Sequence, residues 1–101
     1  MTYQALTKKM VRFQGVEEST MMGTHCLRYK GDFFTMWFDK ANSLIVKLPA
    51  ERVTELIELG EGNPFNFTRK QFKEWVLIPG GRSGDFEKLA REALKFARSK
   101  K

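Results

Sequence analysis

The chain has 101 residues, one of them Cys, a formal net charge of +6 and a hydrophobic fraction of 42%. This length allows one domain, at residues 1–101, and this composition argues against a disordered chain. No apolar run reaches the ~20 residues of a membrane span, no apolar signal segment begins the chain, and one Cys forms no internal disulfide, so we expect a cytoplasmic protein without a membrane partner.

The first half of the chain predicts a helix followed by three strands. The helix is indicated by an apolar stripe at spacings of three and four, made by Tyr3, Leu6, Met10 and Phe13. Gly15 is suited to end it, and residues 16–20 are polar and are interpreted as a connection. Three segments rich in β-branched and aromatic residues, with short turns between them, are then expected as strands at residues 24–30, 32–38 and 43–48.

The second half predicts a helix, a strand and a final helix. Pro49 suits the first position of a helix over residues 49–60, and Gly60 suits its end. A fourth strand is expected at residues 72–78 and a last helix at residues 85–99. The predicted fold is therefore α+β, in the order helix-strand-strand-strand-helix-strand-helix, with helices packed on an antiparallel meander of about four strands.

Side chains alternate along a strand, so the predicted sheet has two faces. One is uniformly apolar and is the expected core, made by Leu27, Tyr29, Phe34, Met36, Phe38, Leu44, Val46 and Leu48. The other combines apolar side chains with cations, at Arg28, Lys30, Phe33, Trp37, Ile45 and Lys47. Rings among cations on an open sheet are typical of a platform for single-stranded nucleic acid. The alternative is that a terminal helix covers the rings and that the cations lie at the sheet margin.

Two further groups of cations are candidate contacts for nucleic acid. The segment 68–75 places Arg69, Lys70 and Lys73 around Phe72 and Trp75. The last helix carries a stripe made by Lys88, Arg91, Lys95 and Arg98. Such a stripe either follows a phosphate backbone or is a solvated helix face, because Glu87 and Glu92 lie within reach of its cations.

The sequence offers no catalytic, metal or cofactor site. His25 and Cys26 are adjacent, so a regular strand would direct them to opposite faces, and no second His or Cys completes a zinc set. The loop at residues 80–84 is rich in Gly but lacks the patterns of phosphate-binding loops. The carboxylates are not paired among apolar residues. We therefore expect a protein that is not an enzyme and that holds no cofactor or metal.

Several segments together resemble a known bacterial family. They are "MMGTHCLRYKGDFF" at residues 21–34, "LIVKLPAERV" at residues 44–53 and "KEWV" at residues 73–76. The chain resembles the N-terminal domain of the TfoX/Sxy family, which is related in fold to the YjbR/MmcQ group. The resemblance implies an α+β domain with an antiparallel sheet and no catalytic residues. Structural or contact roles fall to the matching positions Met22, Gly23, Phe34, Lys47 and Trp75.

The resemblance also bears on function. In the longer TfoX proteins this domain accompanies a second one, and those proteins regulate natural competence; YjbR-like relatives have been suggested to bind DNA. We expect a regulatory or interaction module that binds nucleic acid or a partner protein. The predicted binding residues are Arg28, Lys30, Trp37, Lys47, Arg69, Lys70, Lys73 and Trp75.

Two alternatives remain open from the sequence. One is a small-molecule-binding or enzyme-accessory domain, with a pocket between sheet and helices lined by Met22, His25, Trp37 and Trp75. The other is a homodimer that buries the mixed face of the sheet.

Overall fold

A computed structural model describes residues 1–66 and 72–100. Within them lie the helices α1 (Tyr3–Met10), α2 (Ala50–Glu58) and α3 (Phe86–Ser99). The strands are β1 (Val16–Met21), β2 (Thr24–Tyr29), β3 (Asp32–Phe38), β4 (Ser43–Lys47), β5 (Asn63–Pro64) and β6 (Trp75–Pro79). Two short 3₁₀ helices, η1 (Asp39–Ala41) and η2 (Gly80–Asp85), follow β3 and β6. Among the described helices, none is long and apolar enough to cross a membrane.

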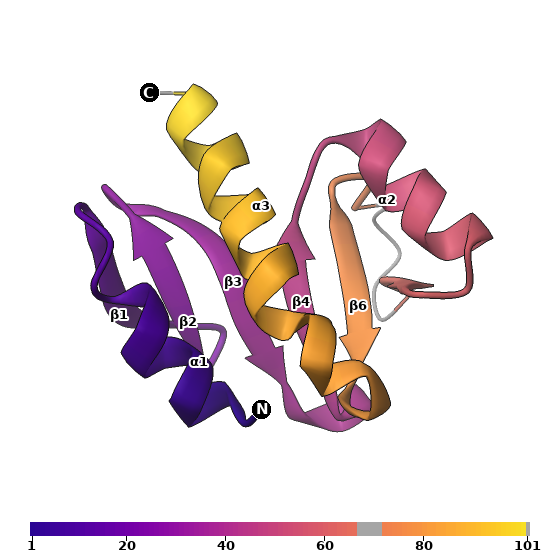
Figure 1. Cartoon of the computed structure of the whole chain (residues 1–101), viewed down its shortest axis with the longest axis horizontal. Helices are drawn as coiled ribbons and strands as arrows, with labels where there is room; N and C mark the ends of the chain where they lie inside the picture. Colours follow the sequence, from indigo (N-terminus) through magenta and orange to yellow (C-terminus); the bar gives the residue numbers. More distant parts are fainter. Residues whose placement is uncertain (67–71, 101) are drawn as a thin grey trace.

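All six strands belong to one antiparallel sheet in the order β1-β2-β3-β4-β6-β5. Strands β1 to β4 form a meander, and the chain then passes through α2 and returns to place β6 beside β4. Figure 1 shows α1 and α3 side by side on one face of the sheet, with α2 beside β6. The predicted α+β class and antiparallel sheet are thus confirmed.

The predicted number of four strands is wrong, because β1 and β5 were missed. β1 is the polar segment that we interpreted as a connection, yet it pairs with β2 along its whole length. It lies at the sheet edge and has no fully buried residue, so its sequence lacks the apolar alternation of an inner strand. β5 has only two residues, too few for a periodic signal.

The predicted first helix is also too long. α1 begins after Thr2, whose hydroxyl accepts from the backbone N–H of Ala5, and it ends at Met10 rather than at Gly15. Phe13 therefore lies outside the helix, and its ring packs against the helix-side core from the connection to β1.

The main core lies between the sheet and the helices. Its strand residues include Leu27, Tyr29, Phe34, Leu44, Val46, Val76 and Ile78. α1 contributes Leu6 and Met10, and α3 contributes a stripe made by Phe86, Leu89, Ala90, Ala93, Leu94 and Ala97. The small residues on this stripe let α3 approach the sheet closely, and α3 contacts β2, β3 and β4.

A β-bulge in β3 changes which side chains share a face. Leu27 pairs with Thr35 and Arg28 pairs with Phe33, so Phe34 is an extra residue. Phe34 and Thr35 consequently both face the helices, and strict alternation fails at this point. Our division of the strand faces is wrong beyond the bulge. Met36 and Phe38, predicted in the main core, lie on the opposite face, whereas Trp37 packs against the helix-side core.

The second face of the sheet carries its own apolar cluster. Its buried members are Cys26, Phe33, Met36, Ile45, Phe65 and Leu77, with Phe72 and Trp75 packed against them. Trp75 contacts Phe33, Phe65 and Phe72 with ring centroids 5.0, 5.2 and 4.3 Å apart. The side chains of Phe65 and Phe72, rather than a terminal helix, therefore pack against the rings on this face.

Two tight hairpins join the first three strands. Met22 and Gly23 connect β1 to β2 with φ values of 55° and 77°, and Lys30 and Gly31 connect β2 to β3 with 49° and 93°. Positive φ at both loop residues is the pattern of a type I′ turn, which matches the twist of the flanking strands. Glycine adopts this conformation freely, whereas Met and Lys do so at a cost.

Replacing Met22 by Asn should stabilise the protein. Met22 is 68% exposed, so little packing is lost, and Asn tolerates positive φ far better than Met. We expect the free energy of unfolding, measured by chemical denaturation, to rise by about 0.5–1 kcal/mol. Met22→Ala is the matched control: it removes the same side chain, keeps the backbone cost and should give no gain. An equal gain from both variants would show that side-chain exposure, not backbone conformation, is responsible.

Candidate functional site

Arg28, a predicted binding residue, is held by hydrogen bonds within the hairpins. Its Nε donates to Ser19 Oγ at 3.0 Å. Its two terminal nitrogens donate to the carbonyl oxygens of Gly31 at 3.0 Å and Thr20 at 3.3 Å. The guanidinium group thus links β2 to β1 and to the neighbouring turn, and each of its three nitrogens donates one of these hydrogen bonds. Arg28 therefore has a structural role in this sheet.

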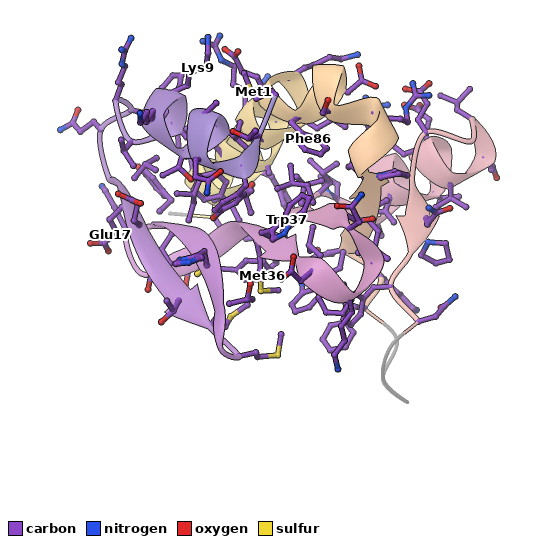
Figure 2. The ribbon with its side chains drawn as sticks, turned by 90° about the horizontal axis from the view of Figure 1, so that it is seen from below. Met1, Lys9, Glu17, Met36, Trp37 and Phe86 are labelled. Carbon is purple, nitrogen blue, oxygen red and sulfur yellow. The ribbon has the colours of Figure 1, made fainter. Side chains whose placement is uncertain are left out.

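The two Trp residues lie on opposite faces of the sheet and do not form one platform. Trp37 faces the helices, with its ring centroid 6.2 Å from that of Tyr3 and 6.3 Å from that of Phe86. Figure 2 shows Trp37 directed toward Phe86 and Met36 directed away from the helices. Trp75 belongs to the ring cluster on the other face. The predicted arrangement of Arg28 and Trp37 on one face is wrong, because the bulge in β3 directs the side chain of Trp37 to the helix side of the sheet.

The remaining predicted cations are not gathered on the second face of the sheet. Lys47 is partly buried, and its Nζ lies 6.0 Å from the ring centroid of Phe33. Lys73 is exposed in the turn that precedes β6. Lys30 is exposed in a hairpin turn, with its Nζ 5.5 Å from the centroid of Tyr29. Arg69 and Lys70 lie outside the described residues.

A group of cations does gather where α3 passes the loop after α1 and the β2–β3 hairpin. The guanidinium carbon of Arg98 lies 5.7 Å from the ring centroids of both Phe13 and Tyr29. Arg91 lies over the same Phe13 ring at 5.2 Å, and Lys30 lies over Tyr29. Lys95 lies on the same exposed stripe of α3. We call Lys30, Arg91, Lys95 and Arg98 the cationic surface.

The carboxylates of α3 leave most of this surface uncompensated. Glu87 pairs with Arg91 at 3.4 Å and with Lys9 at 3.5 Å. Glu92 lies on another side of α3, where it accepts from Nε and Nη2 of Arg52 on α2 at 3.1 and 3.2 Å. This bidentate bond raises the pKa of Arg52. Within the described residues, Lys30, Lys95 and Arg98 form no ion pair with a carboxylate.

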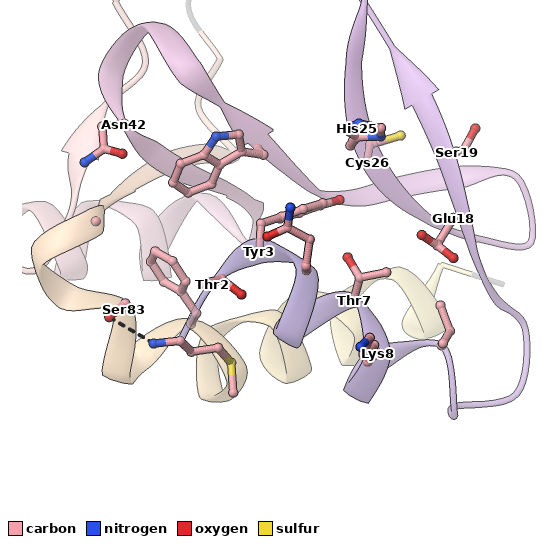
Figure 3. Close-up of a pocket in the computed structure, with 16 residues that line it drawn as sticks. Thr2, Tyr3, Thr7, Lys8, Glu18, Ser19, His25, Cys26, Asn42 and Ser83 are labelled. Atoms are coloured by element: carbon pink, nitrogen blue, oxygen red, sulfur yellow. Dashed lines mark hydrogen bonds between the residues drawn. The ribbon is translucent and has the colours of Figure 1, made fainter.

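A pocket of about 830 Å³ lies between α1, η2 and the first three strands. Its wall combines the rings of Tyr3, Trp37 and Phe86 with polar residues that include Thr7 and Glu18. In Figure 3, Tyr3 and Thr7 extend from α1 toward the strands, and the N-terminal amine of Met1 donates to Ser83 Oγ at 3.2 Å. This bond links the start of the chain to η2 and forms one end of the pocket wall.

The pocket overlaps only in part with the one expected from the sequence. His25 and Trp37 line it. Met22 does not, because it lies at a hairpin tip and is 68% exposed. Trp75 lines a separate cavity of about 370 Å³ beside α2. Tyr3 and Thr7 could not be identified as lining residues from their positions in the sequence, because both are also compatible with the buried face of a helix.

His25 and Cys26 form no metal site. No group of three or more His, Cys, Asp or Glu residues is placed to hold a metal within the described part of the chain. Cys26 is 1% exposed and lies in the second-face cluster, and its burial raises the pKa of the thiol. The thiol is therefore protonated at neutral pH, which makes it a poor nucleophile.

Cys26 should react slowly with a thiol reagent in the folded protein. Burial restricts access, and the raised pKa lowers the thiolate fraction. We expect the rate of reaction with 5,5′-dithiobis-(2-nitrobenzoate) to rise at least tenfold in denaturant. A free Cys peptide of the same local sequence, measured with and without denaturant, is the control for the effect of solvent. A native rate equal to that of the peptide would contradict both the burial and the pKa direction.

Comparisons with protein-family models, with curated proteins and with solved structures find no match for this chain.

Proposed function

We propose that this domain is a non-enzymatic interaction module that binds the phosphate backbone of nucleic acid through the cationic surface. The observation that carries the proposal is the position of Arg98 over both Phe13 and Tyr29, with Arg91 and Lys30 on the same two rings. Two chain segments distant in sequence, the β2–β3 hairpin and α3, thereby bring their cations to one exposed place, and the loop after α1 contributes the ring of Phe13.

The rings favour binding because they hold the cations in position before a ligand arrives. An Arg side chain that lies on an aromatic ring has already lost part of its rotamer freedom, so less entropy is lost when it meets a phosphate. The planar guanidinium group retains its outward N–H donors in this arrangement, and these suit phosphate oxygens. Arg91 and Arg98 are both exposed and lie about two turns apart on the same stripe of α3.

The charge balance supports a polyanion as partner. The chain carries a net charge of +6, and among the described residues Glu87 is the one carboxylate that forms an ion pair with the cationic surface. Attraction of this kind acts on the backbone and carries no base sequence information. The resemblance to the TfoX N-terminal domain, with its suggested DNA-binding relatives, agrees with such a role.

The surface differs from the sheet platform expected from the sequence. Of the residues predicted to bind, Lys30 belongs to it. Lys47 does not, because its Nζ lies 6.0 Å from the ring centroid of Phe33 on the second face of the sheet. Stacking of bases on Trp37 is not part of the proposal, since that ring packs against Tyr3 and Phe86.

Lys95→Gln should weaken binding to oligonucleotides and reduce its dependence on salt. Each phosphate contact that is lost reduces the slope of log K against log salt by about one. We would measure binding of fluorescent single-stranded and double-stranded oligonucleotides by anisotropy across a salt series. The Arg91→Gln/Lys95→Gln double variant should lose about two units of slope for duplex DNA.

Lys40→Gln is the matched control. Lys40 is exposed in η1, at the end of β3 opposite to the hairpin that carries Lys30, and its removal changes the net charge by the same amount. We expect it to leave the slope unchanged. Equal effects of Lys40→Gln and Lys95→Gln would mean that net charge alone is responsible, and absence of binding at low salt would reject the proposal.

A further inference from the structure

The outer side of β1 is a free edge of the six-stranded sheet. We infer that this edge binds an extended segment of another protein that carries two consecutive basic residues and pairs with β1 as an added strand. The surface consists of the outward main-chain groups of β1 and the carboxylates of Glu17 and Glu18. It goes beyond the proposed function, because none of its residues belongs to the cationic surface.

The two edge strands of the sheet differ in length and composition. β5 has two residues, Asn63 and Pro64, and both shortness and proline protect an edge from further pairing. β1 has six residues, contains no Pro or Gly, and pairs with β2 in one unbroken register from Val16 to Met21. Of the two described edges, β1 is therefore the one that keeps the regular ladder that an added strand requires.

The turn between β1 and β2 determines which main-chain groups of β1 point outward. Met21 and Thr24 flank its two-residue loop and form a hydrogen-bonded pair, and along the ladder such pairs alternate with pairs that are not hydrogen-bonded. The hydrogen bond from the N–H of Lys30 to the carbonyl of Gly15, at 3.1 Å, agrees with this alternation. The residues whose N–H and C=O groups point away from β2 are therefore Val16, Glu18 and Thr20.

Several of these outward groups have no partner in the protein. The N–H of Val16 donates to the carbonyl of Phe13 at 3.2 Å, and the carbonyl of Thr20 accepts from Arg28 at 3.3 Å. Among the described residues, the N–H and C=O of Glu18 and the N–H of Thr20 form no hydrogen bond outside the ladder with β2. Glu18 and Thr20 are both exposed. An added strand would pair with these groups at consecutive ladder positions.

The charge of the edge indicates what kind of strand it accepts. Glu17 and Glu18 are exposed, and within the described residues neither carboxylate forms an ion pair. Arg28 lies opposite Glu17 in the ladder, but its nitrogens donate to other residues of the two hairpins. Because neighbouring strand residues face opposite sides of a sheet, one carboxylate lies on each side of the edge. Two consecutive basic residues of an added strand would face them, one on each side.

The same carboxylates disfavour a second copy of this chain as the partner. Pairing of two β1 strands brings Glu17 and Glu18 of both copies into one ladder, and like charges on neighbouring strands are destabilising. A basic strand replaces this repulsion by attraction. The edge thus discriminates against its own copy and accepts a strand of opposite charge.

Three capped peptides that differ only in their central charge test the partner class. They are Thr-Val-Lys-Arg-Val-Thr, Thr-Val-Gln-Gln-Val-Thr and Thr-Val-Glu-Glu-Val-Thr, each titrated into the isotope-labelled full chain and followed by NMR. We expect saturable shifts at the amides of Glu18 and Thr20 with the Lys-Arg peptide. The Gln-Gln peptide should bind about three- to tenfold more weakly, because two cross-strand charge pairs are lost. The Glu-Glu peptide should bind more weakly still.

Methylation of one main-chain nitrogen of the Lys-Arg peptide tests whether it binds as a strand. The N–H groups of successive strand residues point to opposite edges, so one of the two basic residues donates to β1 and the other does not. A peptide with α-N-methyl-lysine and a peptide with α-N-methyl-arginine should therefore differ. One should lose about tenfold in affinity, the effect of a lost main-chain hydrogen bond, and the other should bind like the parent peptide. Equal affinities of the two would contradict strand addition.

The Glu17→Gln/Glu18→Gln variant should lose the preference for basic peptides without unfolding, because both side chains are exposed. The Lys-Arg peptide should bind it about three- to tenfold more weakly, and no better than the Gln-Gln peptide. Glu51→Gln/Glu58→Gln is the matched control. Its two carboxylates are exposed on α2, which contacts β5 and β6 at the other end of the sheet, and its net charge changes equally. It should leave the preference unchanged.

Two further results would overturn the inference. One is the absence of saturable shifts at Glu18 and Thr20 with the Lys-Arg peptide up to its solubility limit. The other is a concentration-dependent shift of the same amides in the chain alone, together with a dimer in light scattering, which would assign the edge to a second copy. Lys95→Gln should bind the peptide like the unaltered chain, so failure here and failure of the proposed nucleic-acid function are distinguished.

Discussion

The bulge in β3 is the constraint on which the rest of this structure depends. By inserting Phe34 between the residues that pair with Leu27 and Arg28, it places two consecutive side chains on the helix side of the sheet. Every later residue of β3 is thereby reversed relative to strict alternation. Trp37 turns toward α1 and η2, and Met36 turns toward the second face. The aromatic wall of the pocket and the ring cluster behind the sheet both follow from this one extra residue.

Aromatic side chains pack on both faces of the sheet. Those on the second face pack on one another, with Phe72 stacked on Trp75. The helix layer instead combines an exposed stripe of cations on α3 with a cavity beneath α1. The two features lie on the same layer and are built from different residues.

The sequence predicted the fold class and most elements because their signals are local. The range of β3 was predicted without error, and β4 and α2 were predicted to within a few residues, since aromatic alternation and the Pro49 and Gly60 boundaries need no tertiary contact. β1 was not predicted, because an edge strand is stabilised by its pairing with a neighbour and its own sequence then needs no apolar pattern. The bulge in β3 was not predicted either, because its effect on stability depends on side-chain packing across the sheet.

The candidate sites were less predictable than the fold. The stripe on α3 was visible in the sequence, but its support by Phe13 and Tyr29 depends on contacts between segments far apart. The sheet platform was a reasonable expectation from alternation and failed where alternation failed. Tyr3 and Thr7 are compatible with the buried face of a helix, and only the folded structure places them in the wall of a pocket.

The bond between the Met1 amine and Ser83 has a consequence for the order in which the domain acquires its properties. The pocket wall joins the first residues of the chain to η2 and Phe86, and contacts of such large sequence separation are costly in loop entropy. A chain emerging from the ribosome can pair β1 to β4 early, yet it has no cavity until its last helix is made and docked. The pocket therefore forms only after residues 1–3 and residues 80–86 have come together.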